Sequence, residues 1–233
     1  MTLRTAGGLA ALTCAATYLV GFALLVTVLA PLGFGTDEVD ARAVADFIAE
    51  RPGVMIAWNT TIYIVNALAL VVLVVALQRQ ISPVMPDAAA LTGAIGLIWA
   101  TLVLGAGMIA NVAVERTLAV AADPEAAAAL WQTLHAVELG LGGGNEIAGG
   151  EWLLAVSVTG VTAGTFGRLT AGIGILSGLA GLVTILPSLG EIAGTVFGLG
   201  AIVWFIAVGI VLLRGDRSAF AAGNTALTNL TRQ

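Results

Sequence analysis

Acidic and amide side chains gather in one stretch of an otherwise apolar chain. Glu138, Glu146 and Glu151 surround the glycine-rich residues 140–144, and Asn145 directly precedes Glu146. A charged side chain at the centre of a bilayer costs roughly 2.5–3.5 kcal/mol on insertion scales, so such groups usually face a protein interior or a water-filled cavity. We therefore expect these carboxylates to border a polar pocket for a small molecule, an ion or a proton.

Glu151 is expected to form the floor of this pocket. It lies 13 residues before Gly164, or about 20 Å from the expected inner end of its helix, which is within the hydrocarbon region. Glu146 and Asn145 then form the mouth. The alternatives are a protonated, hydrogen-bonded buried acid, or an ion pair between Glu151 and Arg116.

Polar residues on two earlier segments supply the expected lining of the pocket. Asn59 and Asn66, seven positions apart, share one helical face, and Asn111 and Glu115, four positions apart, share another. Asparagines also hydrogen-bond between membrane helices, at about 0.6 kcal/mol on average, and for the asparagines alone we prefer this packing role.

His135, Glu138 and Glu146 are the residues that come nearest to a metal site. Zinc and iron sites usually need three or four protein ligands, whereas the chain has one histidine and one cysteine, Cys14. The chain also lacks lysine, which excludes a retinal or pyridoxal-phosphate Schiff base and a lysine-containing phosphate loop. We expect no metal, no cofactor and no enzymatic activity, and the alternative for His135 is a hydrogen-bonded histidine on a surface helix.

The segments that carry these residues have the composition of membrane helices. Of 233 residues, 59% are hydrophobic and 10% are charged, against about 25% charged in soluble domains. Apolar segments of this length can cross about 30 Å of hydrocarbon. The sequence predicts an all-α, polytopic membrane protein with one six-helix transmembrane domain over residues 1–217. The expected spans lie near residues 6–31, 54–77, 88–114, 145–164, 169–186 and 192–213.

The arginines predict how this bundle sits in a bacterial cytoplasmic membrane. With both termini in the cytoplasm, six of the nine arginines lie inside, as the positive-inside rule requires. Two outer connections, residues 37–51 and 123–138, have the acidic starts and partial apolar stripes of short amphipathic helices. The cytoplasmic tail, residues 218–233, shows no apolar periodicity and is expected to be disordered or loosely helical.

Glycines and tryptophans indicate how the helices pack. The run at 140–144 should bend or unwind its helix, either as a hinge or as a break that exposes backbone groups to a ligand. Small-xxx-small pairs let helices approach closely. These pairs are Gly160/Gly164, Gly174/Gly178 and Gly194/Gly198. Trp58 and Trp131 suit anchoring at the membrane interface, whereas Trp99 and Trp204 fall in mid-helix and are expected in the core.

Three stretches carry a family resemblance: residues 4–21 (RTAGGLAALTCAATYLVG), 142–157 (GGGNEIAGGEWLLAVS) and 197–214 (FGLGAIVWFIAVGIVLLR). With the six-helix layout, the chain resembles a bacterial and archaeal membrane family catalogued as domain of unknown function 4386. The resemblance implies fold and location and brings no activity. The invariant residues that it implies are Glu146, Gly149, Gly150 and Trp152.

The function expected from these observations is that of a small transporter, or a ligand or ion sensor, with an outward-facing polar pocket. The first alternative is a structural or regulatory subunit that packs against a membrane partner or a second copy through its glycine faces. The second is a metal-assisted membrane enzyme. The expected surroundings are the lipid bilayer and a small molecule or ion, with no nucleic-acid partner.

Overall fold

The computed structural model describes residues 1–36, 39–143 and 146–230, and these residues form helices and turns without a strand. The first half of the chain comprises α1 (Leu3–Leu24), η1 (Leu25–Leu29), η2 (Ala30–Leu32), α2 (Ala41–Glu50), α3 (Pro52–Asn59), η3 (Thr60–Val65) and α4 (Asn66–Ile81). The second half comprises α5 (Pro86–Ala119), α6 (Pro124–Glu138), η4 (Leu139–Gly143), α7 (Ile147–Thr162), α8 (Arg168–Val183), η5 (Pro187–Leu189) and α9 (Gly190–Leu230).

The starts of α2 and α6 follow from local sequence. The Asp40 side chain accepts hydrogen bonds from the first backbone N–H groups of α2, and Asp123 does the same for α6. Each aspartate satisfies amides that have no partner within the helix. Within the two predicted segments, Ala41–Glu50 and Pro124–Glu138 are helical.

In the part of the chain that the structure describes, four helical segments are long and apolar enough to cross a membrane, which indicates a membrane-embedded protein. They are Leu3–Leu32, Pro52–Ile81, Pro86–Ala119 and Gly190–Arg214. The helices α7 and α8 have 16 residues each, or about 24 Å of length, and fall short of the roughly 20 residues that a full crossing needs. The predicted span 145–164 is shortened because α7 begins at Ile147 and because Gly164, with φ of 73°, lies in the turn after it.

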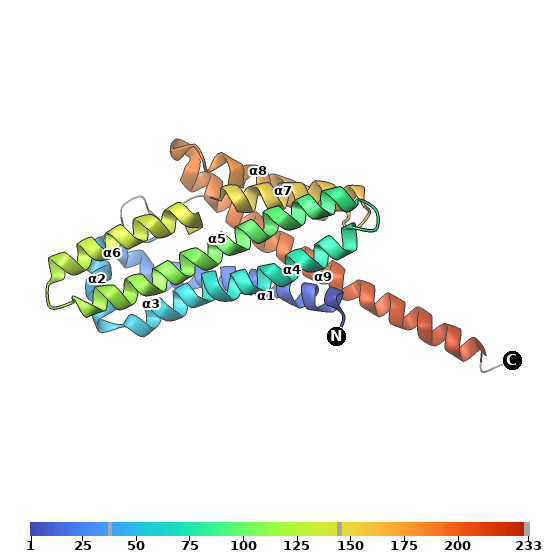
Figure 1. Cartoon of the computed structure of the whole chain (residues 1–233), viewed down its shortest axis with the longest axis horizontal. Helices are drawn as coiled ribbons and strands as arrows, with labels where there is room; N and C mark the ends of the chain where they lie inside the picture. Colours follow the sequence, from blue (N-terminus) through green and yellow to red (C-terminus); the bar gives the residue numbers. More distant parts are fainter. Residues whose placement is uncertain (37–38, 144–145, 231–233) are drawn as a thin grey trace.

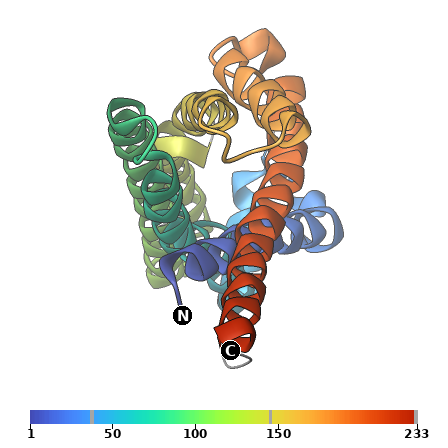
Figure 2. The same ribbon diagram turned by 90° about the vertical axis from the view of Figure 1, so that its right-hand side faces the viewer.

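The long helix α5 runs along the length of the bundle, and α6 and α7 lie end to end beside it (Figure 1). The break between them is η4, in which Gly142 has φ of 146°. The predicted bend at the glycine run is confirmed. The last part of α9 projects beyond the bundle, on the side of the N-terminus (Figures 1 and 2). It is helical through Leu230, so most of the predicted tail has regular backbone structure.

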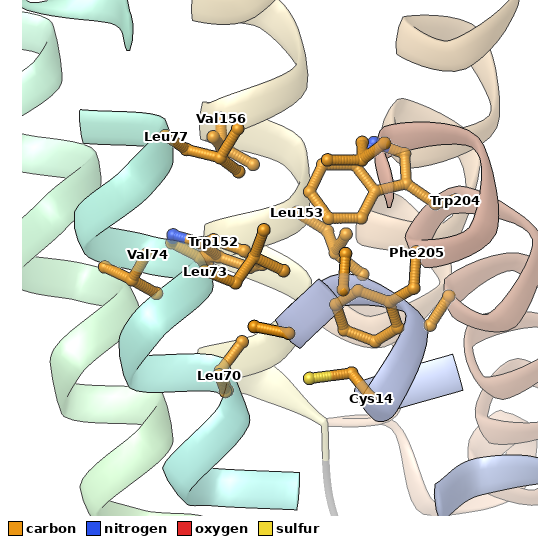
Figure 3. Close-up of a cluster of buried hydrophobic side chains, with 14 of the residues drawn as sticks. Cys14, Leu70, Leu73, Val74, Leu77, Trp152, Leu153, Val156, Trp204 and Phe205 are labelled. Atoms are coloured by element: carbon orange, nitrogen blue, oxygen red, sulfur yellow. The ribbon is translucent and has the colours of Figure 1, made fainter. Parts of the chain in front are cut away.

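The core is aromatic and aliphatic and contains tryptophans from three helices. Trp152 lies beside Trp99, with ring centroids 5.5 Å apart, and meets Trp204 edge-on at the same separation. Cys14 and Phe205 close the cluster from α1 and α9 (Figure 3). Trp99 and Trp204 were predicted to be core residues, and both are buried.

Glycines let α7 and α8 approach to backbone contact. A Cβ atom built on Gly150 would lie 2.7 Å from the carbonyl oxygen of Gly178, and one on Gly174 would overlap the Ser157 hydroxyl. The predicted pair Gly174/Gly178 therefore has its expected role. Gly194 differs, because no atom lies within 4 Å of its Cβ position.

Candidate functional site

Two adjoining cavities lie between α1, the α3–α4 segment, α5, α6 and the start of α7. We call the cavity of about 510 Å³ the wide chamber and that of about 170 Å³ the narrow chamber. Leu25, Trp58, Ile62 and Tyr63 line both cavities and thus form the partition between them. Each cavity has room for several water molecules.

The wide chamber contains a buried carboxylate with two partners. Glu138 is 3% exposed; its Oε1 accepts a hydrogen bond from the Tyr63 hydroxyl at 2.5 Å, and its Oε2 lies 2.8 Å from Nδ1 of His135. Trp131 stacks on the His135 ring at 4.6 Å, and Phe34 meets both rings edge-on. His135 and Glu138 thus share one helical face as predicted, and they form a hydrogen-bonded pair inside the protein.

The narrow chamber contains a second carboxyl group that is held differently. The Glu146 backbone N–H donates to the Thr184 hydroxyl at 2.9 Å, and its carbonyl accepts from the Gly150 N–H at 2.7 Å. These bonds fix the main chain at the start of α7. The Glu146 carboxyl has no hydrogen bond or ion pair with any other described residue, and it lines the chamber. It is therefore available to a ligand.

The three asparagines have different roles. Asn59 is buried and lines the wide chamber. Asn66 lines the narrow chamber, but its Nδ2 donates to the Thr17 hydroxyl of α1 at 2.7 Å. Asn111 donates to the Thr60 hydroxyl at 3.1 Å, so both of these amides join neighbouring helices. Asn59 and Asn66 line different chambers because η3, a π-helical insertion, lies between them.

Glu151 differs most from its predicted position. Its side chain is exposed, and it borders a separate depression of about 310 Å³ between α5 and the η4–α7 segment, with Ile95 and Ile98. It has no hydrogen bond or ion pair with any described residue, Arg116 included. Gly150 packs on the α8 backbone, and the next residue lies about 100° further round the helix, so Glu151 points away from the core.

The remaining predicted residues lie outside the chambers. Glu115 is exposed on α5 and lines neither of them, and Asn145 is outside the described residues. Trp152 belongs to the core, where its indole nitrogen packs against Gly96. Five residues of the predicted set line the chambers: Asn59, Asn66, His135, Glu138 and Glu146.

Aromatic side chains were the part of the site that sequence reasoning missed. Trp58 and Trp131, predicted as interfacial anchors, are 8% and 4% exposed and line the chambers. The Trp58 indole N–H donates to the Gly21 carbonyl at 3.3 Å, which holds the ring in the partition. One indication of an aromatic residue in the site was present in the sequence. Tyr63 lies four residues after Asn59 and three before Asn66, and therefore on the same helical face.

Non-standard helical turns shape both chambers. The π-helical segments η1 and η3 contribute Leu25 and Tyr63 to the cavity walls, and the kink in η4 contributes Gly142. A π-turn inserts one residue into the helix and redirects the side chains on either side, and such turns occur frequently at functional sites. The apolar composition of these segments gives no warning of the insertions.

The two chambers have similar linings. Each contains one carboxyl group amid aromatic rings, and no three histidine, cysteine, aspartate or glutamate side chains gather as a metal centre would need within residues 1–36, 39–143 and 146–230. In comparisons with family models, curated proteins and solved structures, the chain matches none. Its function must therefore be inferred from the geometry of its own residues.

Proposed function

We propose that this protein binds a small polar molecule or ion in the paired chambers and acts as a small transporter or a ligand sensor of the membrane. The observation that supports this proposal is that two carboxyl groups, Glu138 and Glu146, line adjoining cavities within an apolar helical bundle. Polar groups at such positions are costly unless they have a partner or a function. Glu138 has its partners, whereas Glu146 has none among the described residues.

We propose six crossings, with α7 and α8 as the two short ones, and both termini in the cytoplasm. In this arrangement α2, α6 and the end of α5 cap the bundle on the outer side, and the wide chamber opens there. The excess of arginines on the opposite side supports this orientation. The resemblance to the domain of unknown function 4386 agrees with this layout and adds no activity.

Thiol labelling tests whether the wide chamber is reached from outside. Cys14 is the only cysteine and is fully buried, so the native chain supplies an unreactive background. In Asn59→Cys, a charged, membrane-impermeant methanethiosulfonate reagent added to intact cells should modify the new thiol. The matched control is Leu73→Cys, which places a thiol at a fully buried core position and should stay unmodified. Absence of labelling at position 59 in folded protein would refute the outward-open chamber.

One observation favours the alternative function, a subunit that packs against a partner. Glu151 is exposed in an apolar depression and has no partner among the described residues. A carboxyl group on a lipid-facing surface is costly, and a partner helix with a hydrogen-bond donor would satisfy it. Carbodiimide labelling of intact membranes checks this alternative: protection of Glu151 that is lost on detergent extraction supports a partner, and reactivity in both states rejects one.

A further inference from the structure

We infer that the narrow chamber binds a small organic cation, of the quaternary ammonium or protonated alkylamine class. This inference rests on the proposed function, because it assigns the ligand of the same cavity. The inference rests on the Glu146 carboxyl group, which has no partner among the described residues and lies in a chamber lined by aromatic rings. Those rings belong to Tyr18, Phe22, Trp58, Tyr63 and Trp99.

The charges around the chamber favour a cation. Glu146 is the one ionisable carboxyl among the described lining residues of the narrow chamber, and no arginine lines either chamber. Across the partition, the Glu138 carboxyl group is held in place by hydrogen bonds with His135 and Tyr63. An anion in the narrow chamber would find no basic side chain among its described lining residues.

The aromatic walls favour an organic cation over a metal ion. Magnesium and calcium take six or more oxygen ligands, whereas this chamber offers the Glu146 carboxyl, two tyrosine hydroxyls and the Asn66 amide, whose nitrogen already bonds Thr17. Aromatic faces attract weakly hydrated ammonium groups, and cages of this kind recognise methylated amines. A chamber that is rich in rings and poor in oxygen therefore matches an alkylammonium group.

The volumes and arrangement of the two chambers limit the size of the cation and indicate a path by which it could enter. At about 170 Å³ the narrow chamber is smaller than the roughly 300–1,000 Å³ of pockets for drug-sized ligands, so the cation must be small. The wide chamber lies on the other side of Trp58 and Tyr63 and continues the aromatic lining with Phe34 and Trp131. A cation that enters through it would meet aromatic surface along its path and would pass the Tyr63–Glu138 hydrogen bond.

The test uses choline and tetramethylammonium as probes with the purified, detergent-solubilised full chain. Binding is measured by calorimetry and by the fluorescence of Trp58 and Trp99, which line the chamber. We expect both cations to bind, and choline to bind at least about tenfold more tightly than 3,3-dimethyl-1-butanol, its uncharged analogue of the same shape. Glu146→Gln removes the carboxyl group that lines the chamber and should weaken choline binding by about tenfold or more, which corresponds to about 1.4 kcal/mol.

The matched control is Glu151→Gln, which neutralises an exposed carboxyl group on the same helix and should leave binding unchanged. The Glu146 carboxyl has no protein partner among the described residues, so Glu146→Gln should keep the fold, and a melting curve verifies this. Equal choline affinity in Glu146→Gln, equal affinity for the uncharged analogue, or no binding of either cation overturns the inference. If Asn59→Cys is still labelled from outside in those cases, the proposed outward-open wide chamber stands and the assignment of an organic cation to the narrow chamber is wrong. Absence of that labelling refutes the proposed function itself.

Discussion

Replacing Gly150 with alanine should test the contact that positions the start of α7. A methyl group at this site would lie 2.7 Å from the Gly178 carbonyl oxygen and 2.7 Å from the Leu182 nitrogen. Both are backbone atoms of α8, so relief requires the two helices to separate. Overpacking of this kind costs about 1–3 kcal/mol, and the upper half of the range applies because no side chain can rotate away.

Alanine also improves helix propensity by about 1 kcal/mol relative to glycine, so the net loss expected for Gly150→Ala is about 1–2 kcal/mol. The matched control is Gly172→Ala on α8, where nothing lies within 4 Å of the new methyl group and a gain of up to about 1 kcal/mol is expected. The assay is the free energy of unfolding from reversible denaturation in mixed micelles. If Gly150→Ala is as stable as Gly172→Ala, the close α7–α8 packing described above is wrong.

Three further substitutions probe the chambers. Gly142→Ala should lower the melting temperature through a cost of about 1–3 kcal/mol, because φ of 146° is unfavourable for a side chain, whereas Gly140→Ala has open space and should be neutral or stabilising. Tyr63→Phe removes one of two hydrogen bonds from buried Glu138 and should lower the free energy of unfolding by about 1.5–3 kcal/mol; an unchanged value would refute the importance of this bond. Thr184→Val removes the hydroxyl that accepts the first backbone N–H bond at α7 and should cost about 0.5–2 kcal/mol, while Thr184→Ser should retain the native stability.

Features fixed by local chemistry could be predicted from the sequence. The acidic starts of the two outer segments indicated helices there, and in the structure the Asp40 and Asp123 side chains accept hydrogen bonds from backbone N–H groups in the first turns of α2 and α6. The glycine run breaks its helix at Gly142 for an equally local reason. The pairing of His135 with Glu138 needed only their separation of three positions on one helix.

Features fixed by the packing of distant helices could not be predicted. A helix that is apolar on all sides gives no periodic signal for its buried face. The sequence therefore could not show which of Glu146 and Glu151 faces the interior. The orientation of α7 depends on Gly150, whose contact with the α8 backbone leaves Glu151 on the outer side of the helix. Trp58 lies in a cavity wall, where its indole N–H donates to the Gly21 carbonyl of α1, a contact that its own segment of sequence does not reveal.

The unequal lengths of the helices have a consequence for the surrounding lipid. In the proposed six-crossing arrangement, α5, with its 34 residues, exceeds the thickness of a typical hydrocarbon core, whereas α7 and α8 fall about 6 Å short of it. Lipid tails beside the short pair must compress or the whole molecule must lean, each at a fraction of a kcal/mol per ångström. The protein should therefore deform the surrounding annular lipid only beside α7 and α8. A bilayer of shorter acyl chains should relieve that hydrophobic mismatch.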